Sequence, residues 1–298
     1  MKRYWLLFFS FSILGLSGFL FFLAWSLTGA EGGGFNLPGK SRVAVVEIRG
    51  GIFDPKEAIE QLNRVYENDG LKALILRIDS PGGGVSASQE IYDAVLRVKE
   101  KKKVIVSMGT VAASGGYYIA VAADTIVALP GTITGSIGVL MDYTNVEGLL
   151  DLIRVKAEVL KSGKMKDVGS PLRPITPEER AYLQDLLDGM HRQFIEAVAR
   201  GRGLTMAETE ELADGRVFTG EEAVDRGLVD ELGGQQKAVE IAQDLLGLDE
   251  EPELVYPKKK KAGFFELLAE GEASSAFLKW YYFLREGRAL YWTKGMML

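Results

Sequence analysis

The sequence predicts an α/β fold in which a parallel or mixed sheet is covered by helices on both faces. Two observations lead to this prediction. Several short segments are apolar almost without interruption, which is typical of strands that are buried on both faces. Segments whose apolar residues recur with a helical period separate these strands along the chain.

The first half of the chain contains most of the predicted sheet. Strands are predicted at residues 43–48, 73–78, 104–108 and 125–129. Helices are predicted at residues 55–66 and 86–100. Glycines closely follow the first three strands, so each of these strands is expected to end in a turn.

The second half is predicted to be more helical. A long helix is expected at residues 177–200, because Thr176 and Pro177 are followed by two glutamates in its first turn. A short helix is expected at residues 205–213, and the segment from 216 to 234 leads into a last helix that ends near residue 246. The predicted domain therefore covers residues 42–250.

The N-terminus predicts a membrane anchor. Residues 4–28 carry no charge, and about 20 helical residues span the hydrocarbon core of a bilayer. Lys2 and Arg3 precede this segment and Glu31 follows it, so residues 1–28 are expected to be a single-pass anchor in the cytoplasmic membrane with the N-terminus inside. A cleaved signal peptide is the alternative, but its apolar core is usually shorter. Residues 29–41 are predicted to be a linker, and the domain after it to be extracytoplasmic.

The composition excludes several kinds of chemistry. The chain has 298 residues and a net charge of -6, which argues against a general nucleic-acid binder. It has no cysteine, so disulfides, thiolate zinc sites and a cysteine nucleophile are absent. His191 is the single histidine, so a site with several histidine ligands is excluded too. We therefore predict no metal site.

Two glycine-rich loops are the candidate sites of chemistry. Residues 79–84 and residues 112–118 each follow a predicted strand, and ligands gather at the carboxyl ends of strands in open α/β sheets. Consecutive glycines let backbone N–H groups approach a ligand, which suits a phosphate cradle or an oxyanion hole. The first loop matches neither common nucleotide-binding glycine motif, and by itself a plain turn would explain it.

Ser114 is the candidate nucleophile in the second loop. It lies between a predicted strand and an apolar helix, where a helix-capping serine is the alternative interpretation. A serine nucleophile needs a base, and His191 lies far along the chain in a predicted helix. A neutral lysine is the other established partner, which requires a pKa well below the usual value of about 10.4. Lys161, Lys164 and Lys166 are candidates, and spacing alone does not choose among them or exclude an exposed basic loop.

Five ordered blocks of the sequence resemble one bacterial family, signal peptide peptidase A, in its short form with one catalytic domain. The resemblance runs from about residue 43 to 234, in the blocks 80–85, 108–118, 134–139, 161–167 and 216–220, the last continuing to 227–230. It implies a fold similar to the Clp protease and crotonase group, built from repeated β-β-α units. It also implies that no metal or nucleotide cofactor takes part.

The resemblance assigns a role to each site residue. It implies that Ser114 is the nucleophile and that Lys166, rather than the two lysines before it, is the general base. Ser136 is expected to hydrogen-bond this lysine and to orient its amine. The backbone N–H groups of Gly83 and Gly115 are expected to form the oxyanion hole.

The resemblance also implies an assembly and a substrate. Members of the family form a dome-shaped octamer in which the serine of one protomer meets the lysine of its neighbour. They cleave remnant signal peptides in the membrane, so a serine endopeptidase is expected. Three alternatives stay open: a crotonase-like enzyme acting on a coenzyme A thioester, a non-catalytic membrane scaffold, and a membrane protease that regulates another membrane protein. Covalent labelling by a fluorophosphonate would separate the first from a peptidase.

The C-terminal segment, residues 251–298, differs from the rest. It contains a run of four lysines, Lys258 to Lys261, followed by an aromatic and apolar stretch from 264 to 291. We expect this stretch to pack on the domain or on a neighbouring subunit. Contact with lipid headgroups or with a membrane-bound substrate is the alternative.

Overall fold

The strands form one sheet in the computed structural model, which describes residues 41–257 of the chain. The sheet has eight strands. Their bounds are β1 (Arg42–Arg49), β2 (Leu71–Ser80), β3 (Lys103–Ala113), β4 (Thr125–Ala128), β5 (Ile133–Gly135), β6 (Val217–Thr219), β7 (Glu231–Leu232) and β8 (Glu253–Val255).

The sheet is mixed, and its centre is parallel. The strand order is β6-β5-β3-β2-β1-β8, and β4 pairs with both β3 and β7. Every pair in the described sheet is parallel except β5 with β6. Parallel neighbours need long crossover connections, which explains why helices alternate with strands in the sequence.

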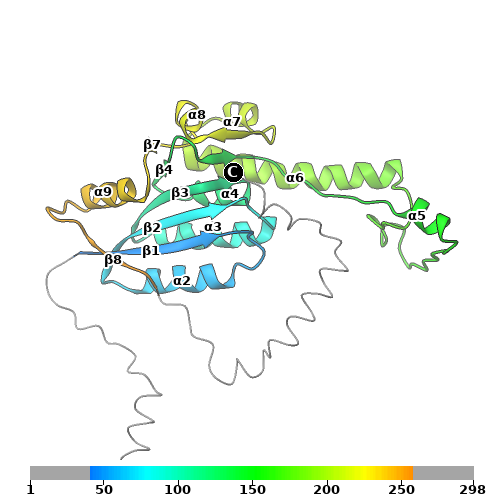
Figure 1. Ribbon diagram of the computed structural model, residues 1–298, viewed down its shortest axis with the longest axis horizontal. Helices are drawn as coiled ribbons and strands as arrows, with labels where there is room; N and C mark the ends of the chain where they lie inside the picture. Colours follow the sequence, from blue (N-terminus) through cyan, green and yellow to red (C-terminus); the bar gives the residue numbers. More distant parts are fainter. Residues whose placement is uncertain (1–40, 258–298) are drawn as a thin grey trace, which may run out of the picture. The chain divides into compact units, whose positions relative to one another are not determined.

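Helices cover both faces of the sheet, as predicted (Figure 1). Their bounds are α2 (Lys56–Glu67), α3 (Val85–Lys99), α4 (Gly115–Ala120), α5 (Glu147–Leu152), α6 (Pro177–Arg202), α7 (Met206–Leu212), α8 (Gly220–Asp225) and α9 (Gln235–Leu245). Side chains that alternate along β1, β2 and β3 point to opposite faces. One set packs with α2, α3, α4 and the end of α6, and the other packs with α9. The α/β class with a mixed sheet is therefore confirmed.

Helix α6 is the longest described element and joins two regions. The predicted start is confirmed: Thr176 and Glu179 form a reciprocal capping box, and Pro177 is the first helical residue. The helix ends where Gly203 adopts a left-handed conformation with φ 66°. Phe194 to Ala199 belong to its buried part, whereas Tyr182 and Leu186 are exposed. Only the end of α6 therefore packs on the core, and its beginning carries the segment that precedes it.

Several short elements escape sequence reasoning. Strands β5 and β8 have three residues each, too few for a periodic pattern. The segment 216–234 folds into β6, α8 and β7 before α9 begins. Because β8 pairs with β1, the sheet continues past residue 250.

The predicted anchor at residues 1–28 lies outside the described residues, as does the linker apart from Ser41 and the C-terminal segment from residue 258 onward. Between residues 41 and 257, no helix combines the length and the apolar character that crossing a bilayer requires.

Two glycines on α6 predict opposite effects of alanine on stability. A Cβ on Gly201 would lie 2.1 Å from the carbonyl oxygen of Val121, whereas a Cβ on Gly189 would meet no atom within 4 Å. We expect Gly201→Ala to destabilise the protein by about 1–3 kcal/mol through overpacking. Gly189→Ala should be neutral or stabilising by up to about 1 kcal/mol. Thermal unfolding of the two variants compares them, and equal melting temperatures would contradict the packing of α6 on α4.

Candidate active site

Ser114 lies at a sharp turn between β3 and α4. Strand β3 continues past the predicted end at residue 108 to Ala113, so Ser114 is the first residue after it. Its φ is 51° and its ψ is -121°, a positive-φ conformation that non-glycine residues seldom adopt and that clusters at functional sites. Its carbonyl accepts the first helical hydrogen bond from the N–H of Tyr118 at 2.8 Å. The Ser114 side chain forms no capping hydrogen bond, so the capping alternative does not explain this serine.

Ser136 occupies the matching position on the neighbouring strand. Ala113 of β3 pairs with Gly135 of β5, and in each strand this is the last residue before the serine. The N–H of Ser114 donates to the carbonyl of Gly135 at 2.9 Å. Ser136 also has a positive φ, 52°, and its N–H donates to the carbonyl of Arg216 at 2.8 Å. The structure thus brings the two serines side by side in register.

The two glycine-rich loops touch each other at this turn. A Cβ on Gly82 would lie 2.6 Å from the backbone nitrogen of Gly115 and 2.9 Å from the Cβ of Ser114. A Cβ on Gly115 would lie 2.3 Å from the Oγ of Ser88 and 3.3 Å from the nitrogen of Gly83. Side chains at these positions would push the loops apart, so the approach of the two backbones requires glycine.

Buried polar contacts hold the first loop in place. The hydroxyl of Ser80 donates to the carbonyl of Gly50 at 2.6 Å and accepts from the N–H of Gly82 at 3.1 Å. The backbone of Ile52 pairs with the loop on its other side, through the carbonyl of Gly82 and the N–H of Gly84. The N–H of Gly83, between them, has no acceptor in the described part of the chain.

Gly83 and Gly115 therefore offer two free backbone donors beside Ser114. Gly115 begins α4, so its N–H has no acceptor in a preceding helical turn. Free backbone N–H groups next to a serine hydroxyl can stabilise the oxyanion that forms during acyl transfer. Together with the N-terminal end of α4, they make the surroundings of Ser114 favourable to negative charge.

A small pocket with mainly apolar walls opens at Ser114. Gly83, Ser114 and Gly115 line it on one side. The other lining residues are Val85, Ser88, Tyr118, Gly138, Val139, Met190 and Phe194. Residues of α6 thus form part of the pocket, which sequence reasoning missed. The apolar spacing of α6 could have placed Phe194 in the core but not beside Ser114.

His191 does not take part in this pocket. The sequence placed it in a helix far along the chain from Ser114, and it is partly buried on α6. Its Nε2 is buried and has no hydrogen-bond partner among residues 41–257. The neighbouring Met190 lines the pocket, whereas His191 does not. The histidine is therefore not positioned as a base for Ser114.

The lysine cluster lies on an arm, residues 140–176, that precedes α6 (Figure 1). Lys161 forms an ion pair with Asp167, and Lys164 forms one with Glu178. Lys166 is exposed, and no ion pair of its amine is found among residues 41–257. Of the three candidates, Lys166 therefore has the free amine.

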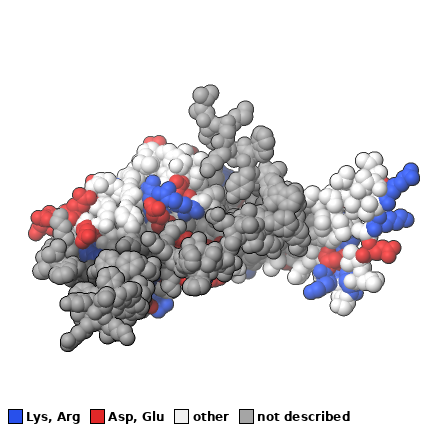
Figure 2. Space-filling model, turned by 60° about the horizontal axis from the view of Figure 1, so that its bottom comes forward, with Lys and Arg blue, Asp and Glu red and all other residues white. Residues whose placement is uncertain are grey.

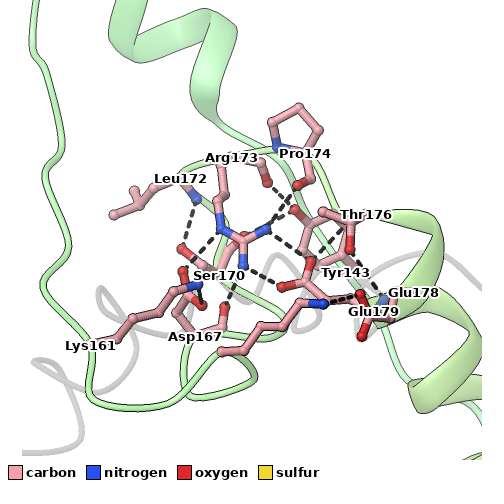
Figure 3. A network of polar contacts seen from close by, with 11 residues as sticks. Tyr143, Lys161, Asp167, Ser170, Leu172, Arg173, Pro174, Thr176, Glu178 and Glu179 are labelled. Carbon is pink, nitrogen blue, oxygen red and sulfur yellow. Dashed lines mark hydrogen bonds and ion pairs between the residues drawn. The ribbon is translucent and has the colours of Figure 1, made fainter.

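A polar network fixes this arm to the start of α6 (Figure 3). Arg173 donates from Nε to Asp167 at 3.0 Å, and its two terminal nitrogens bind both oxygens of Glu179. Glu179 is only 5% exposed and also accepts from the N–H of Thr176. The hydrogen bonds from Arg173 and Thr176 lower the pKa of Glu179 to about 2.

The structure does not bring Lys166 and Ser114 together within one protomer. The arm is tied to Glu179, whereas Met190 and Phe194 of the same helix line the Ser114 pocket. At 1.5 Å per helical residue, the two places are separated by about 16–22 Å along α6. A lysine side chain is too short to span this separation. Ser114, Gly83, Gly115 and Ser136 thus form one group, and Lys166 belongs to another.

Comparisons with known proteins agree with the fold. The profile described as "Peptidase family S49" matches residues 97–249, and the profile "Clp protease" matches residues 48–134. A provisionally named protease of Synechocystis, slr0021, is 44% identical over 216 residues, which are 72% of this chain and 78% of that protein.

Two further relatives come from other branches of life. A provisionally named protease of Methanocaldococcus jannaschii is 37% identical over 223 residues, covering 73% of this chain and 71% of that protein. The chloroplastic serine protease SPPA of Arabidopsis thaliana is 35% identical over 243 residues, covering 77% of this chain and 35% of that protein. The chain therefore belongs to peptidase family S49, the family of the SppA proteases, and is a serine peptidase.

Proposed function

We propose that the chain hydrolyses peptide bonds through an acyl-enzyme, with Ser114 as the nucleophile and Lys166 of a neighbouring copy as the general base. The observation that carries this proposal is the turn at Ser114, which presents a serine beside the free N–H groups of Gly83 and Gly115. Membership of a serine peptidase family supports the same chemistry.

The proposed mechanism assigns a residue to the proton transfers and to the binding of the oxyanion. The neutral amine of Lys166 takes the proton of the Ser114 hydroxyl while the oxygen attacks the scissile carbonyl carbon. The N–H groups of Gly83 and Gly115 hold the resulting oxyanion. The protonated lysine gives its proton to the leaving amine, and a water molecule activated by the neutral lysine then releases the acyl group. We assign to Ser136 the role of accepting a hydrogen bond from the lysine amine.

The ion pairs of the arm support the choice of Lys166. A lysine amine that binds a carboxylate is not free to accept the hydrogen bond and the proton of a serine hydroxyl. Lys161 and Lys164 are both paired in this way, by Asp167 and Glu178. Lys166 is exposed on the same arm without such a partner in the described residues, so a neighbouring protomer can receive its amine.

The exposed apolar side chains of the arm support a shared active site. Eight large apolar residues of the arm are exposed: Leu140, Met141, Leu149, Leu152, Ile153, Val155, Val159 and Leu160. Tyr182 and Leu186 extend this surface onto α6. Uncharged surface also covers much of the arm in Figure 2, with charged side chains towards its edges. Such patches mark protein interfaces, so we propose that the arm docks on a second copy of the chain.

The proposed substrates are peptides held at the membrane, and remnant signal peptides are the main class. Apolar walls formed by Val85, Val139, Met190 and Phe194 suit an apolar substrate side chain at the cleavage site. The uncharged segment at residues 4–28 is proposed to anchor the enzyme, which would then act outside the cytoplasm as a homo-octamer. The proposed reaction uses no cofactor.

Removal of either proposed catalytic residue should abolish cleavage. We expect Ser114→Ala and Lys166→Ala each to lower kcat/KM for a signal-sequence peptide by at least about a thousandfold. Lys164→Ala, a matched lysine on the same arm, should retain most of the activity. Size-exclusion chromatography shows whether the variants assemble. Substantial cleavage by an assembled Lys166→Ala variant would remove Lys166 from the mechanism.

A shared active site also predicts complementation between two inactive variants. When Ser114→Ala and Lys166→Ala chains are co-expressed, some sites combine the intact serine of one chain with the intact lysine of the other. Random mixing in a ring gives about one quarter of the sites both intact residues. We expect activity to recover to about that fraction of the wild-type value. No recovery in mixed oligomers would mean that each protomer carries a complete site of its own.

A further inference from the structure

Within the described residues, the ion pairs between residues 161 and 179 leave Lys166 without a carboxylate partner. The three carboxylates in these pairs are Asp167, Glu178 and Glu179, and each is bound by a cation other than Lys166. The cations are Lys161 on Asp167, Lys164 on Glu178, and Arg173 on both Asp167 and Glu179. Lys166 stands next to Asp167 in the chain, yet the described structure gives the Asp167 carboxylate to other partners.

Arg173 is the centre of this arrangement (Figure 3). Its guanidinium binds Glu179 through both terminal nitrogens and Asp167 through Nε, and one terminal nitrogen also donates to the Asp167 carbonyl at 3.4 Å. It therefore holds both the side chain and the backbone of the residue after Lys166. The hydrogen bonds from Arg173 and Lys161 keep the pKa of Asp167 well below its usual range.

The position of the Asp167 charge matters for a lysine that must act as a base. A carboxylate beside a lysine favours the protonated form of the amine and so weakens it as a base. Asp167 is the nearest anion along the chain, and its carboxyl group is mostly shielded from solvent, with 12% of its side chain exposed. Lys161 holds Oδ1 of Asp167, and Arg173 holds Oδ2. Without Arg173, Oδ2 loses its partner and becomes available to the amine of Lys166.

We propose that Arg173 is a positioning residue for the lysine of the peptidase dyad. It ties the backbone at Lys166 to the start of α6, and it withdraws the Asp167 carboxylate from the lysine amine. This inference rests on the proposed role of Lys166. Under this inference, the ion pairs of the arm keep the amine of Lys166 free of an anionic partner.

The test is the pH dependence of Ser114 reactivity in the assembled, full-length protein. The rate of labelling by a fluorophosphonate and kcat/KM for peptide cleavage are measured from pH 5 to 10 (a range of about five units) in wild type and Arg173→Met. In each profile the rate rises with pH as the base loses its proton, and this rise is the acidic limb. We expect the acidic limb of both profiles to move to higher pH by about one unit or more in Arg173→Met. Arg180→Met, an exposed arginine next to Glu179, is the matched control and should leave the limb in place.

A second substitution separates electrostatics from packing. In Asp167→Asn/Arg173→Met the freed carboxylate is gone, so the acidic limb should return to the wild-type position even if the maximal rate stays low. A purely structural role would lower the rate of Arg173→Met without moving its limb, and that result would overturn the proposal. If Arg173→Met does not assemble, Arg173→Lys takes its place, because lysine keeps the charge but loses the bidentate contact. A smaller shift in the same direction is then expected, and an unchanged limb again overturns the proposal.

Lys166→Ala distinguishes failure of this inference from failure of the proposed function. If wild-type labelling shows an acidic limb that disappears in Lys166→Ala, the lysine is the titrating base. The Arg173 variants then decide the inference alone. If Lys166→Ala keeps the wild-type limb, the proposed dyad is wrong and the inference fails with it.

Discussion

The candidate active site depends on the close approach of two backbone turns, one after β2 and one after β3. The parallel strands run together from Ala73 and Lys103, so their ends emerge at the same edge of the sheet. At that edge the Cα of Gly82 lies so near the nitrogen of Gly115 that a methyl group would not fit between them. This contact places the free N–H of Gly83 beside Ser114. Any change that separates the two strands would therefore dismantle the proposed oxyanion hole before it affected the serine itself.

Much of this arrangement follows from the sequence. Continuous apolar stretches indicated β1, β2, β3 and β4, and the capping residues Thr176 and Glu179 marked the start of α6. The glycine loops after two strands indicated where backbone donors could gather. These features are local, because a strand, a cap or a turn is specified by a few neighbouring residues. The positive-φ turns at Ser114 and Ser136 were not foreseen, since serine seldom adopts a positive φ.

Contacts between segments that are distant in the chain could not be predicted from the sequence. Nothing in the spacing of α6 indicates that Met190 and Phe194 line the Ser114 pocket. Spacing likewise leaves Lys161, Lys164 and Lys166 equivalent, and only a resemblance separated them. The structure distinguishes them by their partners, because Asp167 and Glu178 occupy the first two. Partner choice depends on how the arm folds back on α6, which is a tertiary property.

The separation of the serine group from the lysine arm has a consequence for control of the proposed peptidase. A lysine becomes a good base only when its amine leaves water and has no anion beside it. On an exposed arm, the ion pairs keep anions away from the lysine amine, but the amine stays in water. Docking of the arm on a neighbour would supply the first condition, because the apolar surface of the arm would then exclude water from the interface. Assembly would thus complete the site and activate its base in one step, and an isolated chain would carry a serine without a competent partner.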